Sequence, residues 1–166
     1  MSLSKLKPLA LIVSLALVST SLAACAFQPV YSGKLAENLQ LAYAEPTTRL
    51  EQIVYQELSF RLGKTTSPKA PLVAVAVSAS SSTPYLSVTA NPNKPYEATA
   101  TATLTVTPRD GVDEKSITIT RTAKAQFTQT GQVLANEAAL IEAQERATRA
   151  AAESLRLALL AALGRG

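Results

Sequence analysis

The 166-residue sequence contains no histidine, no tryptophan and only one cysteine. Without histidine, it lacks the commonest general base and the commonest metal ligand. A single cysteine can form neither an internal disulfide bond nor a thiolate metal cluster. The 16 basic and 12 acidic side chains leave a net charge of +4, too small an excess for a nucleic-acid-binding protein. The composition therefore argues against most catalytic functions, and it predicts a protein with no metal, no cofactor and no nucleic-acid partner.

The first 24 residues have the pattern of a secretory signal peptide. Lys5 and Lys7 supply a positive start, and the apolar run from Leu9 to Val18 follows. This run has ten residues, whereas a helix that spans a bilayer needs about twenty, so a cleavable signal is predicted and not a membrane anchor. Removal of the 24-residue signal leaves 142 residues with 14 basic and 12 acidic side chains. This length predicts one domain, and its charge is nearly balanced.

The signal ends in Leu22-Ala23-Ala24-Cys25, which resembles the lipobox of bacterial lipoproteins. A thiol accepts the diacylglycerol group, and small residues let the scissile bond lie extended in the peptidase. Cys25, the only cysteine, is therefore the predicted lipid-attachment residue, and two or three acyl chains would anchor the protein firmly. Residue 26 is not the aspartate that retains lipoproteins in the inner membrane. We expect a lipid-anchored, periplasm-facing protein of the outer membrane.

The mature chain reads as a lipidated tether, residues 25–37, followed by a single α/β domain, residues 38–166. Hydrophobic periodicity, capping residues and turn residues predict its elements. They are a strand at 39–43, a helix at 48–62, strands at 72–80, 96–107 and 117–127, and a helix at 136–163 capped by Asn136. Residues 81–95, with three prolines, are predicted to be mostly loop.

The two strands at 96–107 and 117–127 alternate small apolar residues with threonine. Both helices need an apolar surface, so we predict an α+β two-layer sandwich. It has a four-stranded sheet with two helices packed on one face, in the order β-α-β-β-β-α. The threonine-rich face is then left open to solvent or to a polar partner. Arg121 falls in the apolar phase and requires a bulge, an edge position or a carboxylate partner. Pairs Glu142–Arg146 and Glu145–Arg149 are expected on the wet side of the last helix.

The segment from Cys25 to Gly33, CAFQPVYSG, is similar to the start of the alphaproteobacterial LPS-assembly lipoproteins, an LptE-like family. Members typically begin Cys-Gly-Phe-x-Pro-Leu-Tyr-Gly, and their last helix also combines Glu, Arg and Ala with a Leu-rich end. In this sequence, residues 144–160 resemble that helix. Ala26, Val30 and the inserted Ser32 depart from the family pattern.

The resemblance implies a non-enzymatic protein that plugs and helps assemble the LPS translocon β-barrel, LptD, and that binds lipopolysaccharide. Basic residues at strand or loop positions are candidates for pairing with its phosphates. They are Lys94, Arg109, Lys115, Arg121 and Lys124. Aromatic residues of the tether and those that flank the 82–95 loop are candidates for partner contact or for packing. They are Phe27, Tyr31, Tyr85 and Tyr96.

Two other functional classes remain open at this point. An accessory lipoprotein of an ABC-type lipid transporter would also combine a lipobox with a small α/β domain. A two-carboxylate glycosidase is not excluded by counting acidic residues. However, Asp110 and Asp113 are the only aspartates, and most glutamates have salt-bridge spacing on helices. We therefore predict that the protein is not an enzyme.

Overall fold

The structure is a computed structural model that describes residues 41–83, 93–109, 111 and 115–163. The chain divides into two units, Met1–Ser32 and Gly33–Gly166, and all described residues belong to the second unit. The predicted signal peptide, lipobox and tether lie outside the described residues, as does Cys25.

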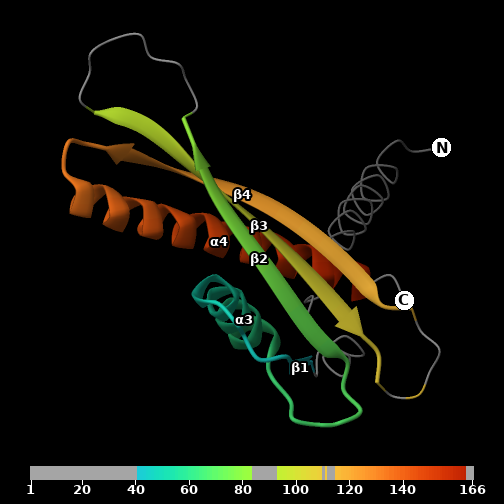
Figure 1. The fold of residues 1–166 in the computed structure, drawn as a ribbon. Helices are drawn as coiled ribbons and strands as arrows, with labels where there is room; N and C mark the ends of the chain where they lie inside the picture. The colour runs from blue at the N-terminus through green and yellow to red at the C-terminus, as the bar shows by residue number, and fades with distance from the viewer. Residues whose placement is uncertain (1–40, 84–92, 110, 112–114, 164–166) are drawn as a thin grey trace, which may run out of the picture. The chain divides into compact units, whose positions relative to one another are not determined.

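The described chain forms one mixed sheet and two helices in the predicted order β-α-β-β-β-α (Figure 1). The elements are β1 (Ala42–Tyr43), α3 (Arg49–Leu62), β2 (Leu72–Ser82), β3 (Lys94–Thr107), β4 (Ile117–Gln129) and α4 (Val133–Leu163). The strands lie in the order β1-β2-β3-β4, with β1 parallel to β2 and the other pairs antiparallel. This confirms the predicted fold class.

The predicted loop at 81–95 is shorter than expected. β2 continues to Ser82, which pairs with Glu97, and β3 begins at Lys94, which pairs with Gln129. Proline at position 95 fits this strand because β2 ends at Ser82, opposite Glu97, so Pro95 has no described partner on the β2 side that would need its missing N–H.

Helix α3 begins and ends where its capping residues predict. The Thr48 hydroxyl accepts a hydrogen bond from the Glu51 N–H, and the Glu51 carboxylate accepts one from the Thr48 N–H, which completes a capping box. The same carboxylate accepts from the hydroxyl and N–H of Thr47, and these bonds lower the pKa of Glu51. Gly63 ends the helix with a positive φ of 80°.

The prediction that Asn136 caps α4 is wrong, because the helix begins three residues earlier, at Val133. The backbone N–H of Asn136 already donates to the Gln132 carbonyl, as in a helix. Its side chain instead binds both backbone groups of Thr130: Oδ1 accepts from the N–H at 2.6 Å and Nδ2 donates to the carbonyl at 2.7 Å. Asn136 therefore holds the turn between β4 and α4.

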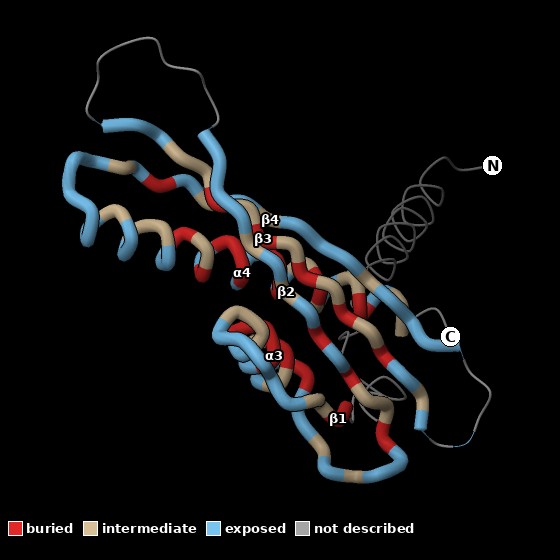
Figure 2. The backbone as a smooth tube through the Cα atoms, viewed as in Figure 1, coloured by how far each residue is buried: buried red, intermediate tan, exposed pale blue. Residues whose placement is uncertain are grey.

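The core lies between the sheet and the two helices (Figure 2). Val73, Leu104, Leu58 and Leu155, from β2, β3, α3 and α4, are all fully buried in one cluster. Three inward residues of β3 are alanine, and Ala98 among them packs in one cluster with Ala143 of α4, so this helix can approach the sheet closely. Both helices pack on the same face of the sheet, as predicted from their apolar stripes.

An ion-pair cluster joins the two helices. The Arg49 guanidinium contacts the Glu145 carboxylate at 2.6 Å, and Arg149 contacts its other oxygen at 3.1 Å. The hydrogen bond from Arg49 is the main cause of the lowered pKa of Glu145. Glu145 is only 9% exposed, so the expectation that it lies on the wet side of α4 is wrong. The packing of α3 against α4 covers this part of the helix.

Candidate functional site

One face of the sheet is covered by both helices, and no described element covers the other. We call the uncovered side the threonine face. On β2 it consists of Leu72, Ala74, Ala76, Ser78, Ser80 and Ser82. On β3 it consists of Pro95, Glu97, Thr99, Thr101, Thr103, Thr105 and Thr107. On β4 it consists of Thr118, Thr120, Thr122, Lys124, Gln126 and Thr128.

The strand register places the hydroxyl groups of this face in ordered rows. Thr101 and Thr122 are directly opposite each other, and their hydroxyl oxygens lie 3.0 Å apart. Thr103 and Thr120 form the next row with the same separation. Such cross-strand pairs stabilise a sheet and hold both side chains in one orientation.

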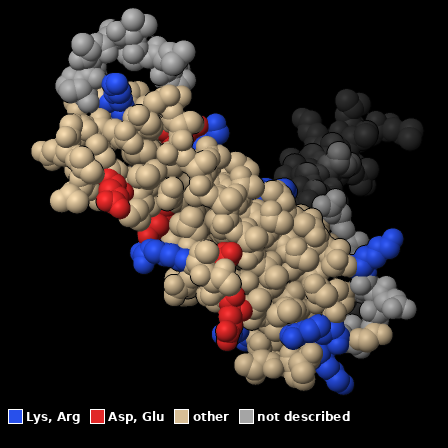
Figure 3. All heavy atoms as spheres, in the orientation of Figure 1, with Lys and Arg blue, Asp and Glu red and all other residues tan. Residues whose placement is uncertain are grey.

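The threonine face carries very little charge. Among its members, only Glu97 and Lys124 are charged, and they form an ion pair with 2.7 Å between the Lys124 ammonium nitrogen and a Glu97 carboxylate oxygen. Figure 3 shows a broad area without charged side chains between Lys, Arg and Glu groups at its margins. A solvated sheet face is polar, and hydroxyl groups that are already paired cost less to desolvate against a polar surface than unpaired polar groups or charges do.

The five basic candidates do not form one site. Lys94 starts β3, while Arg109 follows its other end, so the 14 residues of this strand place them about 45 Å apart. The Arg109 Nε donates to the Ala70 carbonyl at 2.8 Å, which ties it to the loop after α3. Lys115 lies just before β4, near that same end of the sheet.

The other two candidates lie along β4. Lys124 is occupied by its ion pair with Glu97. Arg121 lies on the helix-facing side of the sheet opposite Ala102, but it is exposed because β4 is the outermost strand. Arg121 therefore has a position in the apolar phase of the strand without being buried, because its strand lies at the edge of the sheet. Its guanidinium donates to the carbonyl of Thr120 at 2.8 Å.

Sequence reasoning missed an exposed apolar pair at the end of the sheet that carries Lys94. Val133 and Leu134, the first residues of α4, are 78% and 82% exposed. They follow the last residue of β4, Gln129, which pairs with Lys94. The end of the domain thus combines a cation with apolar side chains. The sequence signal that could have revealed this pair is the presence of apolar residues at the start of a helix, outside its buried stripe.

The aromatic candidates are only partly described. Tyr96 is half-buried and packs against Phe127 with 5.6 Å between ring centroids, which occupies one side of the ring in a small core cluster. Phe27, Tyr31 and Tyr85 lie outside the described residues. In the main core, burial raises the pKa of Tyr43 to about 12.

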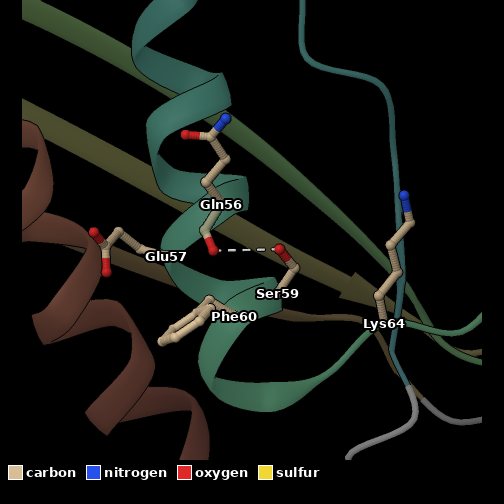
Figure 4. Close-up of a pocket in the computed structure, with 5 residues that line it drawn as sticks. All are labelled: Gln56, Glu57, Ser59, Phe60 and Lys64. Carbon is tan, nitrogen blue, oxygen red and sulfur yellow. Dashed lines mark hydrogen bonds between the residues drawn. The ribbon is translucent and has the colours of Figure 1, made fainter.

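A shallow hollow of about 460 Å³ lies on the outer surface of α3. Gln56, Glu57, Ser59, Phe60 and Lys64 line it (Figure 4). Phe60, which is 85% exposed, and Glu57 point toward α4, and the Ser59 hydroxyl donates to the Gln56 carbonyl. This set pairs no nucleophile with a general base.

Two further features concern the described part of the chain. It contains no group of three or more Cys, Asp or Glu side chains arranged to hold a metal ion. None of its helices is both long enough and apolar enough to cross a membrane.

A family model described as "LptE: Lipopolysaccharide-assembly" matches residues 36–159. A lipoprotein from Caulobacter crescentus is similar in structure, with a TM-score of 0.58 and 18% identity over 79% of this chain and 96% of that one. Rare lipoprotein B from Shewanella oneidensis follows with a TM-score of 0.56 and 15% identity, over 74% and 93%. A minor lipoprotein from Acinetobacter baumannii has a TM-score of 0.50 and 16% identity, over 74% and 89%. The comparison with curated proteins found no significant match.

Proposed function

The chain belongs to the LptE lipopolysaccharide-assembly family, and we propose from this that it is an outer-membrane lipoprotein anchored through Cys25. In this proposal it plugs and helps assemble an LptD-type β-barrel and binds lipopolysaccharide for insertion into the outer leaflet. The role involves no catalytic step. The observation that carries the proposal is the threonine face, a large sheet surface that is polar and almost uncharged.

The threonine face suits the interior of a large outer-membrane barrel, because such interiors are polar and lined by hydrogen-bonding groups. The hydroxyl pairs of Thr101 with Thr122 and of Thr103 with Thr120 leave each oxygen able to accept a further bond. The helices on the opposite side make the sheet rigid. A rigid surface of small side chains loses little conformational entropy when it packs against a wall.

Co-purification from outer membranes in mild detergent tests this role. We expect the tagged lipoprotein to recover a large barrel protein in equal amount. Recovery of the subunits of an ABC-type lipid transporter in its place would support the accessory-lipoprotein alternative. If neither is recovered under conditions that keep other outer-membrane barrels intact, the proposed role is wrong.

For lipopolysaccharide, we propose Lys94 as the principal contact, with Val133 and Leu134 beside it at the same end of the sheet. A phosphate would pair with the ammonium group, and apolar side chains would contact the acyl region. Of the other basic candidates, Lys124 is neutralised by Glu97, and Arg109 and Lys115 lie at the opposite end of the sheet. Arg121 lies along β4, eight residues before Gln129 and on the helix-facing side of the sheet.

Lys94→Glu is expected to weaken binding of purified lipopolysaccharide about tenfold, because it replaces an attraction to phosphate with a repulsion. The binding is measured by surface plasmon resonance on the full-length protein in detergent. Lys69→Glu, an exposed charge reversal near the other end of the sheet, is the matched control and should change the affinity less than twofold. Equal effects of the two substitutions would remove Lys94 from the site.

Cys25→Ser is expected to yield an unprocessed precursor that incorporates no radiolabelled fatty acid. The hydroxyl group of serine does not replace the thiol that accepts the diacylglycerol. Labelling with palmitate in growing cells measures this directly, and Ser32→Cys in the Cys25→Ser background is the control for a thiol at a displaced position. Labelling that survives in Cys25→Ser would show that the lipid is attached elsewhere.

A further inference from the structure

Among the described strands, β4 lies at one edge of the sheet, opposite the short β1, and it is long and regular. Its 13 residues contain no proline, and its pairing with β3 runs without interruption from Ile117 to Gln129. Figure 2 shows exposed residues along most of its length. Natural proteins usually shorten, bend or cover such an edge, because its free backbone groups are a template for another strand.

The hydrogen bonds of β2 determine which backbone groups of β4 point outward. The Val73 carbonyl accepts from Ala44, and the Val75 N–H donates to the Tyr55 hydroxyl. The odd-numbered residues of β2 therefore direct their backbone groups away from β3. Since these directions alternate along a strand, the even-numbered residues of β2 bond to β3.

The register carries this alternation across the sheet. Ala74 pairs with Thr105, so the odd-numbered residues of β3 bond to β2 and its even-numbered residues bond to β4. Leu104 pairs with Ile119, so the odd-numbered residues of β4 bond to β3. The even-numbered residues direct both their N–H and C=O groups toward the open edge. They are Thr118, Thr120, Thr122, Lys124, Gln126 and Thr128.

Two of these six carbonyls have partners, and both partners are arginines. The Thr120 carbonyl accepts from Arg121 at 2.8 Å, and the Gln126 carbonyl accepts from Arg146 of α4 at 2.9 Å. Within the described ranges, the other four carbonyls and the six N–H groups bond to no protein group. The stretch around Thr122 and Lys124 is therefore free to pair.

Arg121 places a positive charge on the core side of this edge. A charge that points to the core side of an edge strand disfavours pairing with an apolar strand. A second copy of β4 cannot neutralise this charge, because β4 has two cations and no acidic residue. A carboxylate on the incoming strand would form an ion pair with the guanidinium, which is exposed and otherwise bound only to a carbonyl.

Apolar groups flank Arg121 on the same side of the sheet. Ile117 is 37% exposed and Ile119 is half-buried against the core. Leu157 of α4, 54% exposed, follows Arg146 by eleven residues, or about three helical turns, so it lies on the side of the helix that reaches β4. An added strand with apolar side chains in this phase would cover these groups.

We propose that the outer edge of β4 is a docking site for an extended segment of another polypeptide, which adds a fifth strand to the sheet. The segment alternates apolar and polar residues and carries a carboxylate opposite Arg121. Arg121 is the specificity residue: it rejects self-pairing and selects an acidic strand. This inference does not depend on the proposed role in the barrel.

Synthetic peptides that alternate threonine and valine, with one central Glu or one central Lys in the valine phase, provide the probes. Binding to the full-length protein in detergent is measured by fluorescence anisotropy. The Glu peptide is expected to bind about tenfold tighter than the Lys peptide, and Arg121→Glu should reverse this order. Thr122→Pro should abolish binding of both peptides, because it removes an outward N–H and leaves the bonds to β3 intact. Circular dichroism checks that both variants are folded.

Several results would overturn the proposal. One is equal affinity for the two peptides, and another is no binding of either. Binding that persists in folded Thr122→Pro would place the peptides elsewhere on the protein. If Arg121→Ala dimerises through β4 while the wild type binds no peptide, Arg121 protects the edge against self-association and does not select a partner. If Thr122→Pro fails to fold, the charge reversal in Arg121→Glu decides the question.

Discussion

Thr103→Arg is expected to reduce recovery of the barrel with the lipoprotein by at least about tenfold, while the domain stays folded. Thr103 lies in the central strand of the threonine face, between Ala76 and Thr120. A long cation there would project from a surface of small side chains and break its hydroxyl pair with Thr120. A group of this size in the centre of an interface prevents close contact over the surrounding area.

The control is Gln52→Arg, which adds the same charge on the exposed side of α3. It should leave the recovery of the barrel unchanged within a factor of two. Both substitutions are on the surface, so their effects on the free energy of unfolding should stay below about 1 kcal/mol. Normal recovery with Thr103→Arg would mean that the threonine face does not contact the barrel.

Leu155→Ala is expected to lower the free energy of unfolding by about 3 kcal/mol. Leu155 is fully buried in the cluster that joins α4 to α3 and the sheet and that also contains Leu58, Val73 and Leu104, so its truncation leaves a cavity in the main core. Because a domain of this size is usually stable by only about 5–15 kcal/mol, the loss is a large fraction of the total. Urea unfolding followed by circular dichroism measures it.

Leu157→Ala provides the matched control two residues further along α4. Leu157 is 54% exposed, so its truncation removes little buried area and should cost less than about 0.5 kcal/mol. Similar losses for the two substitutions would mean that Leu155 does not lie in the main core.

The element order and the sheet faces were predictable because their patterns are local. Alternation of apolar residues with threonine along β3 fixes its two faces, since successive side chains point to opposite sides of a sheet. The capping box of Thr48 and Glu51 likewise depends on residues three positions apart.

Features that depend on distant contacts were not predictable. Nothing in the spacing of Asn136 shows that its side chain binds Thr130, because that bond depends on the turn between β4 and α4. The burial of Glu145 depends on where α3 packs and on Arg49, which is 96 positions away in the sequence. The sequence shows that the charge of Arg121 interrupts the apolar phase of its strand. Only the strand order shows that this strand lies at an edge of the sheet and leaves Arg121 exposed.

The basic candidates show the same limit. The sequence grouped Arg109, Lys115 and Lys124 as possible phosphate contacts, but only the first two lie at the same end of the sheet, because β4 carries Lys124 along its length away from them. The ion pair between Lys124 and Glu97 spans two strands and is visible only from their register. Only the structure brings Lys94 together with the exposed start of α4.

Site-specific photo-crosslinking in living cells tests most directly whether the threonine face contacts the barrel. A photoreactive amino acid at Thr101, in the centre of the face, is compared with one at Gln52 on α3. We expect a strong crosslink to the large barrel protein from position 101 and a weak one or none from position 52. Crosslinks to the barrel from position 52 alone, or from neither position, would contradict the account.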